Sequence, residues 1–436
     1  MTLRLPSRDR QIVLLALPSI VQNITVPLLG LCDVAIMGHI GDAVAIGAIA
    51  VGSMVFNVMY WLFGFLRMGT SGLTSQALGA RRLDATVQTL RQGLLLALAI
   101  GLAIVVLQRP LRTLALWLMQ PTADVGALCR PYYDICVWGA PAVLGLYALT
   151  GWYVGMQNTR TPMLIAIVQN VVNILLSLLF VFAFGLGIEG VALGTLAAQW
   201  SGFALSALLL WHYYGRRLRT SQRADAAPGT TRLWHFLRLN RDIFLRTLCL
   251  VAVNLYFTSA GARQGALLLA VNTLLMQLFT LFSYFMDGFA YAGEALAGRY
   301  YGAGNGAALH DTVRRLLRWG SLVTVLFTLL YWLGGLPFLR LLTSDGCVVA
   351  AAADYLPWAV LIPLCGMGAF VWDGVFIGLT YTRGMLLSCA VATAAFFSLW
   401  TSLHTIWANH ALWLALLVYL ALRGLLQGLL FRKKYG

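Results

Sequence analysis

The stretch GWYVGMQNTR, residues 151–160, returns in altered form as GVFIGLTYTR at residues 374–383, 223 positions further along the chain. A second pair of stretches, TSQALGARR (74–82) and AGEALAGRY (292–300), is similar at a distance of 218 residues. Several matches in chain order at a nearly constant distance predict two copies of one structural unit. The matched residues are Gly151, Gly155, Thr159 and Arg160 with Gly374, Gly378, Thr382 and Arg383, and, at a distance of 222, Tyr133 and Pro141 with Tyr355 and Pro363.

The sequence around these repeats is mostly apolar. Of the 436 residues, 60% are hydrophobic and 10% are charged, and the mean hydropathy is +0.80. These values predict an integral protein of the lipid bilayer. The net charge of +15 does not indicate nucleic-acid binding, because the Lys and Arg residues are scattered between apolar runs. The sequence contains no CxxC and no HExxH motif. Neither a metal site nor a disulfide framework is therefore predicted.

Apolar runs long enough to cross the hydrocarbon, which takes about 20 residues of helix, occur twelve times and predict an all-α membrane protein. The second and eighth runs are too long for a bilayer, so we expect each to tilt or to continue as helix into the cytoplasm. The first run is longer than the apolar region of a signal peptide and is expected to be retained. The spans are 11–37, 44–78, 92–108, 132–156, 162–184, 190–212, 243–260, 265–297, 318–338, 354–379, 385–403 and 411–431.

The basic residues orient these spans. With the N-terminus in the cytoplasm, the inside segments carry 22 of the 30 Lys and Arg residues and the outside loops carry 5, in agreement with the positive-inside rule. We therefore expect both termini in the cytoplasm. A polar central stretch divides the chain into an N-terminal lobe (1–214), a cytoplasmic linker (215–242) and a C-terminal lobe (243–436). Six spans in each lobe give both copies the same orientation, and a central cleft between them would hold a substrate.

One of only 15 acidic residues, Asp33, lies inside the apolar stretch ITVPLLGLCDVAIMGHIG, residues 24–41. A charge at the middle of a bilayer costs roughly 2.5–3.5 kcal/mol, so an acid there indicates function. Asp33 lies roughly 30 Å along a helix that enters from the cytoplasm, which places it in the outer half of the membrane. The alternative is an interfacial acid without a special role. Pro27 supplies a hinge before it, because proline removes a backbone hydrogen bond and bends a helix.

Polar residues on two later spans are expected to surround Asp33. In the fifth span three of them follow one helical stripe, and in the sixth span two are spaced by one turn. Amide groups facing lipid would lack hydrogen-bond partners, so both stripes should turn inward and form a pocket with Asp33. A buried carboxyl group takes up a proton more readily than one in water, so such a pocket suits proton capture and release. The residues are Asn170, Asn173 and Ser177, and Thr195 and Gln199.

Three other acids lie within spans. Asp373, in the tenth span, lies near the midplane of the membrane, where an acid indicates function. The alternative is that it only pairs with another helix for packing. Asp287 and Glu294 lie near the cytoplasmic end of the eighth span, at the depth of Arg67 in the second. These opposite charges could form an inner gate. The alternative is that Arg67 extends to the lipid headgroups and the acids are solvated.

Long stretches of the sequence resemble the multidrug and toxic compound extrusion (MATE) transporters, and within them the DinF-like branch. The resemblance covers nearly the whole chain. It implies an antiporter of two six-helix lobes that expels organic, often cationic or amphipathic, compounds in exchange for H⁺ or Na⁺. The stretches are LPSIVQNITVPLLGLCDVAIMGHIG, FGFLRMGTSGLTSQALG, MQNTRTPM, YFMDGFAYAGEALAGRYYGAGN and WDGVFIGLTYTRGM.

The resemblance also assigns roles. An acid at the position of Asp33 is the proposed proton-coupling site of such transporters, with Asn173 and Thr195 at matching polar positions. Many relatives have a second acid where this chain has Ser177, and its absence favours a single proton over a metal cation. In Na⁺-coupled relatives an acid at the position of Asp373 belongs to a cation site. Those relatives add an acid in the seventh span, where this chain offers Asn254, so a strong Na⁺ site is not expected.

The sequence therefore predicts a monomeric inner-membrane multidrug exporter that works by alternating access, is driven by the proton gradient and carries no cofactor or metal. One alternative is Na⁺ coupling. Another is a flippase for a lipid-linked precursor, which should have an arginine-lined lateral opening. A channel should show rings of like charge or filter loops, and no such pattern is evident. No enzyme motif appears, and the sequence does not name a substrate.

Overall fold

The computed structural model describes residues 7–38, 43–221, 230–343 and 345–436, and these residues form helices without any strand. Ten helical stretches among them are long and apolar enough to cross a membrane. Helix α1 (Ser7–Gly38) adds one more segment, and the long α14 (Thr382–Tyr435) contains two, because Ala408 breaks it with non-helical torsion angles of φ 43° and ψ −120°. The described residues thus form the twelve-span, all-α architecture that the sequence predicts.

The chain divides into two compact units, and each is described by itself. The N-terminal unit is Val21–Asn240, and the C-terminal unit consists of α1 up to Ile20 together with Arg241–Gly436. The boundaries fall inside two helices, α1 and α10 (Thr230–Arg263). Helix α1 therefore begins in the C-terminal unit and continues into the N-terminal unit, and α10 begins in the N-terminal unit and continues into the C-terminal unit. The predicted linker is helical at residues 215–221 and 230–242. Its residues 222–229 lie outside the described chain.

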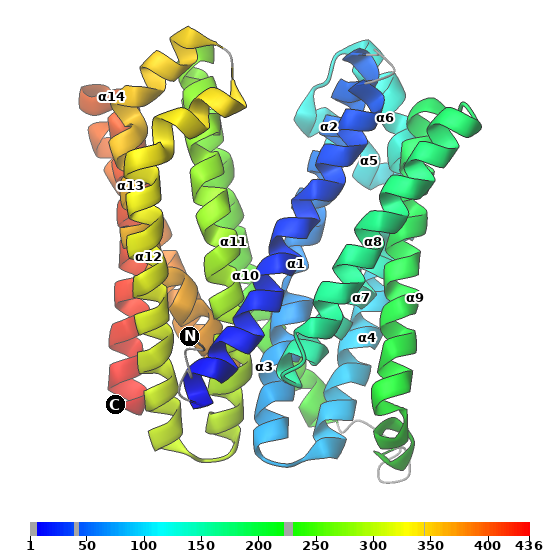
Figure 1. Cartoon of the computed structure of the whole chain (residues 1–436), viewed down its shortest axis with the longest axis vertical. Coiled ribbons are helices and arrows are strands. Elements are labelled where there is room, and N and C mark those ends of the chain that lie inside the picture. Colours follow the sequence, from blue (N-terminus) through cyan, green and yellow to red (C-terminus); the bar gives the residue numbers. More distant parts are fainter. Residues whose placement is uncertain (1–6, 39–42, 222–229, 344) are drawn as a thin grey trace, which may run out of the picture. The chain divides into compact units, whose positions relative to one another are not determined.

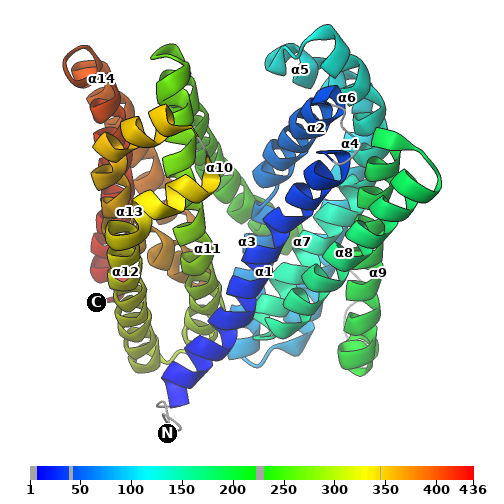
Figure 2. The same cartoon turned by 45° about the horizontal axis from the view of Figure 1, so that its top comes forward.

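In the N-terminal unit, the predicted second span is interrupted by a turn at Phe63 and Gly64, so its length is shared by two helices. Helices α8 and α9 run side by side, as do α4 and α7 (Figure 2). Trp152 fixes this packing, because its indole N–H donates a 2.9 Å bond to the carbonyl of Thr86. The elements are α2 (Ala43–Leu62), α3 (Phe65–Gly79), α4 (Leu83–Val106), α5 (Gln108–Met119), α6 (Ala123–Cys136), η1 (Val137–Gly139), α7 (Ala140–Gly155), α8 (Arg160–Leu178), η2 (Leu179–Ala183) and α9 (Gly187–Ser221).

Helix α5 was not predicted, since the sequence analysis placed an outside loop there. With 12 residues it is about 18 Å long, too short to cross about 30 Å of hydrocarbon. Its Arg112 forms an ion pair with Asp134 of α6. This ion pair links α5 to α6.

In the C-terminal unit, α11, α12, α13 and α14 pack beside one another (Figure 1). The predicted eighth span is one unbroken helix of 37 residues, about 55 Å long. At the break in α14, the side-chain amides of Asn272 and Asn409 exchange hydrogen bonds of 2.8 and 2.9 Å. These paired amides hold the break in place. The bounds are α11 (Ala266–Gly302), α12 (Gly306–Leu342) and α13 (Gly346–Gly378).

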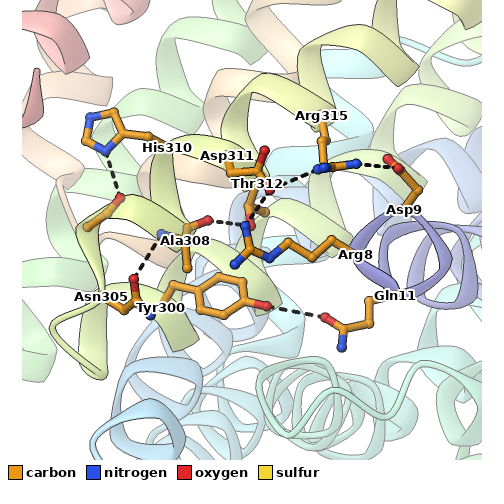
Figure 3. Close-up of polar contacts among 11 residues, drawn as sticks. Arg8, Asp9, Gln11, Tyr300, Asn305, Ala308, His310, Asp311, Thr312 and Arg315 are labelled. Atoms are coloured by element: carbon orange, nitrogen blue, oxygen red, sulfur yellow. Dashed lines mark hydrogen bonds and ion pairs between the residues drawn. The ribbon is translucent and has the colours of Figure 1, made fainter. Parts of the chain in front are cut away.

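The first two turns of α1 are fastened to α12 within the C-terminal unit (Figure 3). Arg8 pairs with Asp311, and Asp9 pairs with Arg315 at 2.5 Å. Asp9 also accepts a 3.2 Å hydrogen bond from the indole of Trp319. We call this group the α1–α12 ion pairs.

The structure corrects the register of one sequence repeat. Helices α3 and α11 end at Gly79 and Gly302, and each is followed two residues later by a left-handed residue, Arg81 (φ 57°) or Gly304 (φ 68°). These equivalent positions are 223 residues apart. The distance of 218 inferred from TSQALGARR and AGEALAGRY was therefore wrong, because it aligned small and basic residues that lie at different heights on the two helices.

Matching glycines show the same equivalence in the packing. A methyl group on Gly151 of α7 would lie 2.2 Å from the carbonyl oxygen of Arg67 in α3. A methyl group on Gly374 of α13 would lie 2.2 Å from the carbonyl oxygen of Ala290 in α11. Both pairs are 223 residues apart, so each copy builds the same close helix crossing. Only glycine allows backbones to approach this closely.

Candidate ion-coupling and substrate sites

Asp33 lies in a buried polar cluster of the N-terminal unit, to which α1, α8 and α9 contribute. The hydroxyl of Thr195 donates a 3.1 Å hydrogen bond to Oδ2 of Asp33 and accepts one of 3.0 Å from Nδ2 of Asn173. Asp33 is 1% exposed and Asn173 is completely buried. The structure therefore brings the acid and two residues of the predicted stripes into one hydrogen-bonded chain. We call Asp33, Asn173, Ser177 and Thr195 the N-terminal cluster.

Ser177 lies one turn after Asn173 and is completely buried. A methyl group on Gly194 of α9 would lie 2.2 Å from its Oγ, so α8 and α9 approach closely here and glycine is needed opposite Ser177. Oδ1 of Asp33, Oδ1 of Asn173 and Oγ of Ser177 are buried and form no hydrogen bond with any described residue. The cluster thus has hydrogen-bonding capacity left over. Directly after Ser177 and Leu178 the helix changes to the π-helical η2, an irregularity that is frequent at functional sites.

The other predicted residues of this pocket lie around the cluster and are not bonded to Asp33. Nδ2 of Asn170 donates a 2.5 Å hydrogen bond to the carbonyl of Thr25 and so fastens α8 to α1 close to Pro27. Pro27 is within α1, six residues before Asp33, and removes one N–H from the hydrogen bonds of the helix. Gln199 lies over Gly139, where a methyl group would meet its Oε1 at 1.6 Å.

Tyr132 of α6 is a residue near the cluster that the sequence analysis missed, since it selected the neighbouring Tyr133 from the repeat. Tyr132 is 2% exposed, and its hydroxyl lies 3.3 Å from Oγ of Ser53 in α2. Its ring occupies the space beside Gly52. Because Gly52 has no side chain, α2 packs closely against this buried tyrosine of α6.

The acid of the C-terminal unit has a different environment. Asp373 of α13 forms ion pairs through Oδ2 with Arg246 of α10 and, at 2.6 Å, with Arg423 of α14. Its Oδ1 accepts a 2.7 Å hydrogen bond from Nε2 of Gln427. All four side chains are buried. We call these four residues the C-terminal cluster. Asp373 is paired with charges on two other helices, as expected for the alternative in which this acid serves helix packing.

Asn254, the other predicted residue of a C-terminal cation site, is not part of this cluster. It lies on α10 two turns beyond Arg246, is partly exposed, and its carbonyl accepts a 3.2 Å hydrogen bond from Thr258. The predicted inner gate is divided between the units, with Arg67 on α3 and with Asp287 and Glu294 on α11. Glu294 is 1% exposed. The gate stays a prediction.

The described residues contain no group of three or more His, Cys, Asp or Glu side chains that could hold a metal ion. The described residues form twelve membrane helices in two similar halves, and each half holds a buried, hydrogen-bonded acid, Asp33 in one and Asp373 in the other. This arrangement defines a membrane transporter for small molecules, built from an internal repeat.

Comparison with known proteins agrees with this class. The MatE family model matches residues 18–179 and 243–400, one segment in each half of the chain. DNA damage-inducible protein F of Escherichia coli (strain K12) is 40% identical, over 99% of this chain and 94% of that protein. The probable multidrug resistance protein NorM of Thermotoga maritima is 22% identical, over 91% of this chain and 84% of that protein.

The fold matches solved structures as well. A crystal structure of a MATE protein in the bent conformation superposes with a TM-score of 0.87 at 18% identity, covering 99% of this chain and 96% of that one. The protein belongs to the MATE family. It is a multi-pass transporter of the inner membrane, and it is not an enzyme.

Proposed function

We propose that this protein exports organic compounds, cationic or amphipathic, in exchange for protons by alternating access, with Asp33 as the proton carrier. The observation that carries the proposal is the environment of Asp33: a carboxyl group that is 1% exposed and hydrogen-bonded to the Thr195 hydroxyl, with no basic side chain bonded to it in the described chain. Gain or loss of a proton changes the charge of this buried group.

The donor set favours a proton over a sodium ion. The N-terminal cluster offers a single carboxylate with neutral hydroxyl and amide groups, and Ser177 stands where many relatives have a second acid. A hard metal cation needs several oxygen ligands converging on one point. A proton needs only one oxygen, and Oδ1 of Asp33 makes no hydrogen bond within the described residues.

The position of Asp33 on α1 links its charge to helix shape. Pro27 weakens α1 six residues earlier, and Asn170 binds the carbonyl of Thr25 on the other side of the proline. Protonation changes how strongly the Asp33 end of the helix is held by Thr195. Bending at Pro27 is then the conformational response that couples proton binding to transport.

The test is Asp33→Asn in proteoliposomes, with export of the fluorescent cation ethidium driven by an imposed pH gradient. We expect exchange to fall to the level of empty vesicles, because an amide has nearly the same shape but does not titrate. Ser177→Ala is the matched control in the same cluster and should keep most of the activity. Export by Asp33→Asn with the pH dependence of the parent protein would contradict the proposal.

The coupling ion is tested separately by imposing a Na⁺ gradient without a pH gradient on the parent protein. We expect no export under this condition. Export driven by Na⁺ alone would replace proton coupling with sodium coupling, even if Asp33→Asn proved inactive.

A further inference from the structure

The C-terminal cluster holds more positive than negative charge. It contains the guanidinium groups of Arg246 and Arg423 and the single carboxylate of Asp373, while Gln427 is neutral. None of the four residues is more than 7% exposed. Arginine remains protonated in proteins. The cluster therefore has a net charge of +1 within the helices of the C-terminal unit.

The hydrogen bonds show the same imbalance. Both arginines bond to one oxygen of Asp373, and Gln427 bonds to the other. Each guanidinium group has five N–H donors. Nε of Arg246 and Nε of Arg423 are buried and have no acceptor among the described residues. One acceptor of the cluster, Oε1 of Gln427, is also buried without a partner among these residues, so the unpartnered donors outnumber the unpartnered acceptors by two to one.

The groups beside the two arginines include a thiol and a phenol, which are uncharged in their ordinary state. The thiol of Cys389 donates to the carbonyl of Arg246 at 3.7 Å, and the ring of Tyr419 lies 5.3 Å from Arg423. Asp242, one turn before Arg246 on α10, is paired with Arg241 at 2.9 Å and accepts a hydrogen bond from Thr382. That acid is already balanced by its own arginine.

We propose that the C-terminal cluster binds a small monovalent anionic group, either the carboxylate of an amphipathic compound or a chloride ion. A buried, uncompensated guanidinium is costly, and an anion would neutralise it while accepting its spare N–H bonds. Planar guanidinium donors suit a carboxylate in particular. Within the proposed export function, this adds amphipathic acids to the substrate class. Binding itself does not depend on proton coupling at Asp33.

The proposal is tested on the purified full-length protein in detergent, by following thermal unfolding through its tryptophan fluorescence. Sodium benzoate and sodium chloride are titrated separately, with sodium sulfate keeping the ionic strength constant. We expect a saturable rise in the unfolding temperature with at least one of the two anions, unchanged when potassium replaces sodium. Saturation with benzoate alone assigns the site to carboxylates, and saturation with chloride alone assigns it to the inorganic ion. A lack of saturable stabilisation by either anion overturns the proposal.

Two variants neutralise the cluster in different ways. Gln427→Glu adds a negative charge and keeps both arginines, and Arg423→Gln removes a positive charge and leaves Arg246 paired with Asp373. Each should weaken anion binding at least tenfold. Arg340→Gln is the matched control, because it removes an exposed arginine from the far end of α12, and it should bind as the parent does. If Arg423→Gln does not fold, Gln427→Glu decides, and its unchanged affinity overturns the proposal.

Discussion

Each half of this transporter buries an acid among its helices, Asp33 in one half and Asp373 in the other, and the two acids have opposite environments. Asp33 is bonded to a threonine hydroxyl, whereas Asp373 is bonded to two arginines and a glutamine. The charge of Asp373 is stabilised by permanent cations, so that acid is held in its ionised form. The charge of Asp33 meets only neutral dipoles. Two copies of one fold therefore contain one acid suited to changing its charge and one suited to keeping it.

The largest contrast should appear when each acid is replaced by its amide. Asp373→Asn leaves two buried guanidinium groups without a counter-ion and should cost about 3–5 kcal/mol of stability. Asp33→Asn keeps the hydrogen bond from Thr195 and should cost no more than about 1 kcal/mol. Thermal unfolding of both variants in detergent measures the difference. Equal losses would show that the two acids have the same structural role.

The equivalence of the two copies can be tested at their close helix crossings. A methyl group on Gly151 or on Gly374 meets a backbone carbonyl at 2.2 Å, so each Gly→Ala change should destabilise the protein by about 1–3 kcal/mol. Gly334→Ala in α12 is the control, since a methyl group there meets nothing within 4 Å. A loss in one half only would mean that the crossings are not equivalent.

Removing one hydroxyl tests how much the N-terminal cluster depends on neutral dipoles. Thr195→Val leaves Asp33 and Asn173 without the atom that joins them and should cost about 1–2 kcal/mol. Proton-driven export should fall as well, whereas Thr195→Ser should behave like the parent protein. Unfolding and transport assays on the two variants separate the hydroxyl from the methyl group. Full activity of Thr195→Val would remove Thr195 from the coupling site.

The smallest effect is expected for the α1–α12 ion pairs, which are partly open to solvent. Asp9→Asn should lower the unfolding temperature less than any change above, because exposed ion pairs contribute little. The difference should disappear in about 1 M salt, where the Debye length is about 3 Å. Asp124→Asn, at an exposed acid in the first turn of α6, controls for loss of charge. A large effect that persists in high salt would point to the indole contact of Trp319 as the source.

Sequence alone predicted the features that lipid imposes on every chain. The twelve helices follow from the length of their apolar runs, and the inward direction of Asn173 and Thr195 follows from the cost of an amide in hydrocarbon. Their hydrogen-bonded contact with Asp33 in the structure agrees with that reasoning. Asn170 and Gln199 share the same stripes but bond or pack elsewhere, because a stripe gives the face of a helix and not the contact of each side chain.

The C-terminal cluster was harder to predict. Arg246 lies near the start of the predicted span 243–260, and Arg423 lies inside the span 411–431. A single arginine in an apolar run can extend to the headgroups, so neither was connected with Asp373. Two arginines within spans of the same half as a membrane acid were the available signal. The break at Ala408 lies in the gap between the predicted spans 385–403 and 411–431, so its place was predicted, but the continuation of these two spans as one broken helix was not. Its position depends on the paired amides of Asn272 and Asn409, which are 137 residues apart.

The α1–α12 ion pairs also bear on how the chain is assembled. Arg8 and Asp311 are 303 residues apart in the sequence. A ribosome that adds roughly 5–20 residues per second takes on the order of 15–60 s to cover that distance. The start of α1 thus enters the membrane long before α12 has been synthesised. The first turn of α1 therefore reaches its final contacts in the C-terminal unit only after α12 has been made, whereas the Asp33 end of the same helix meets α8 and α9 much earlier.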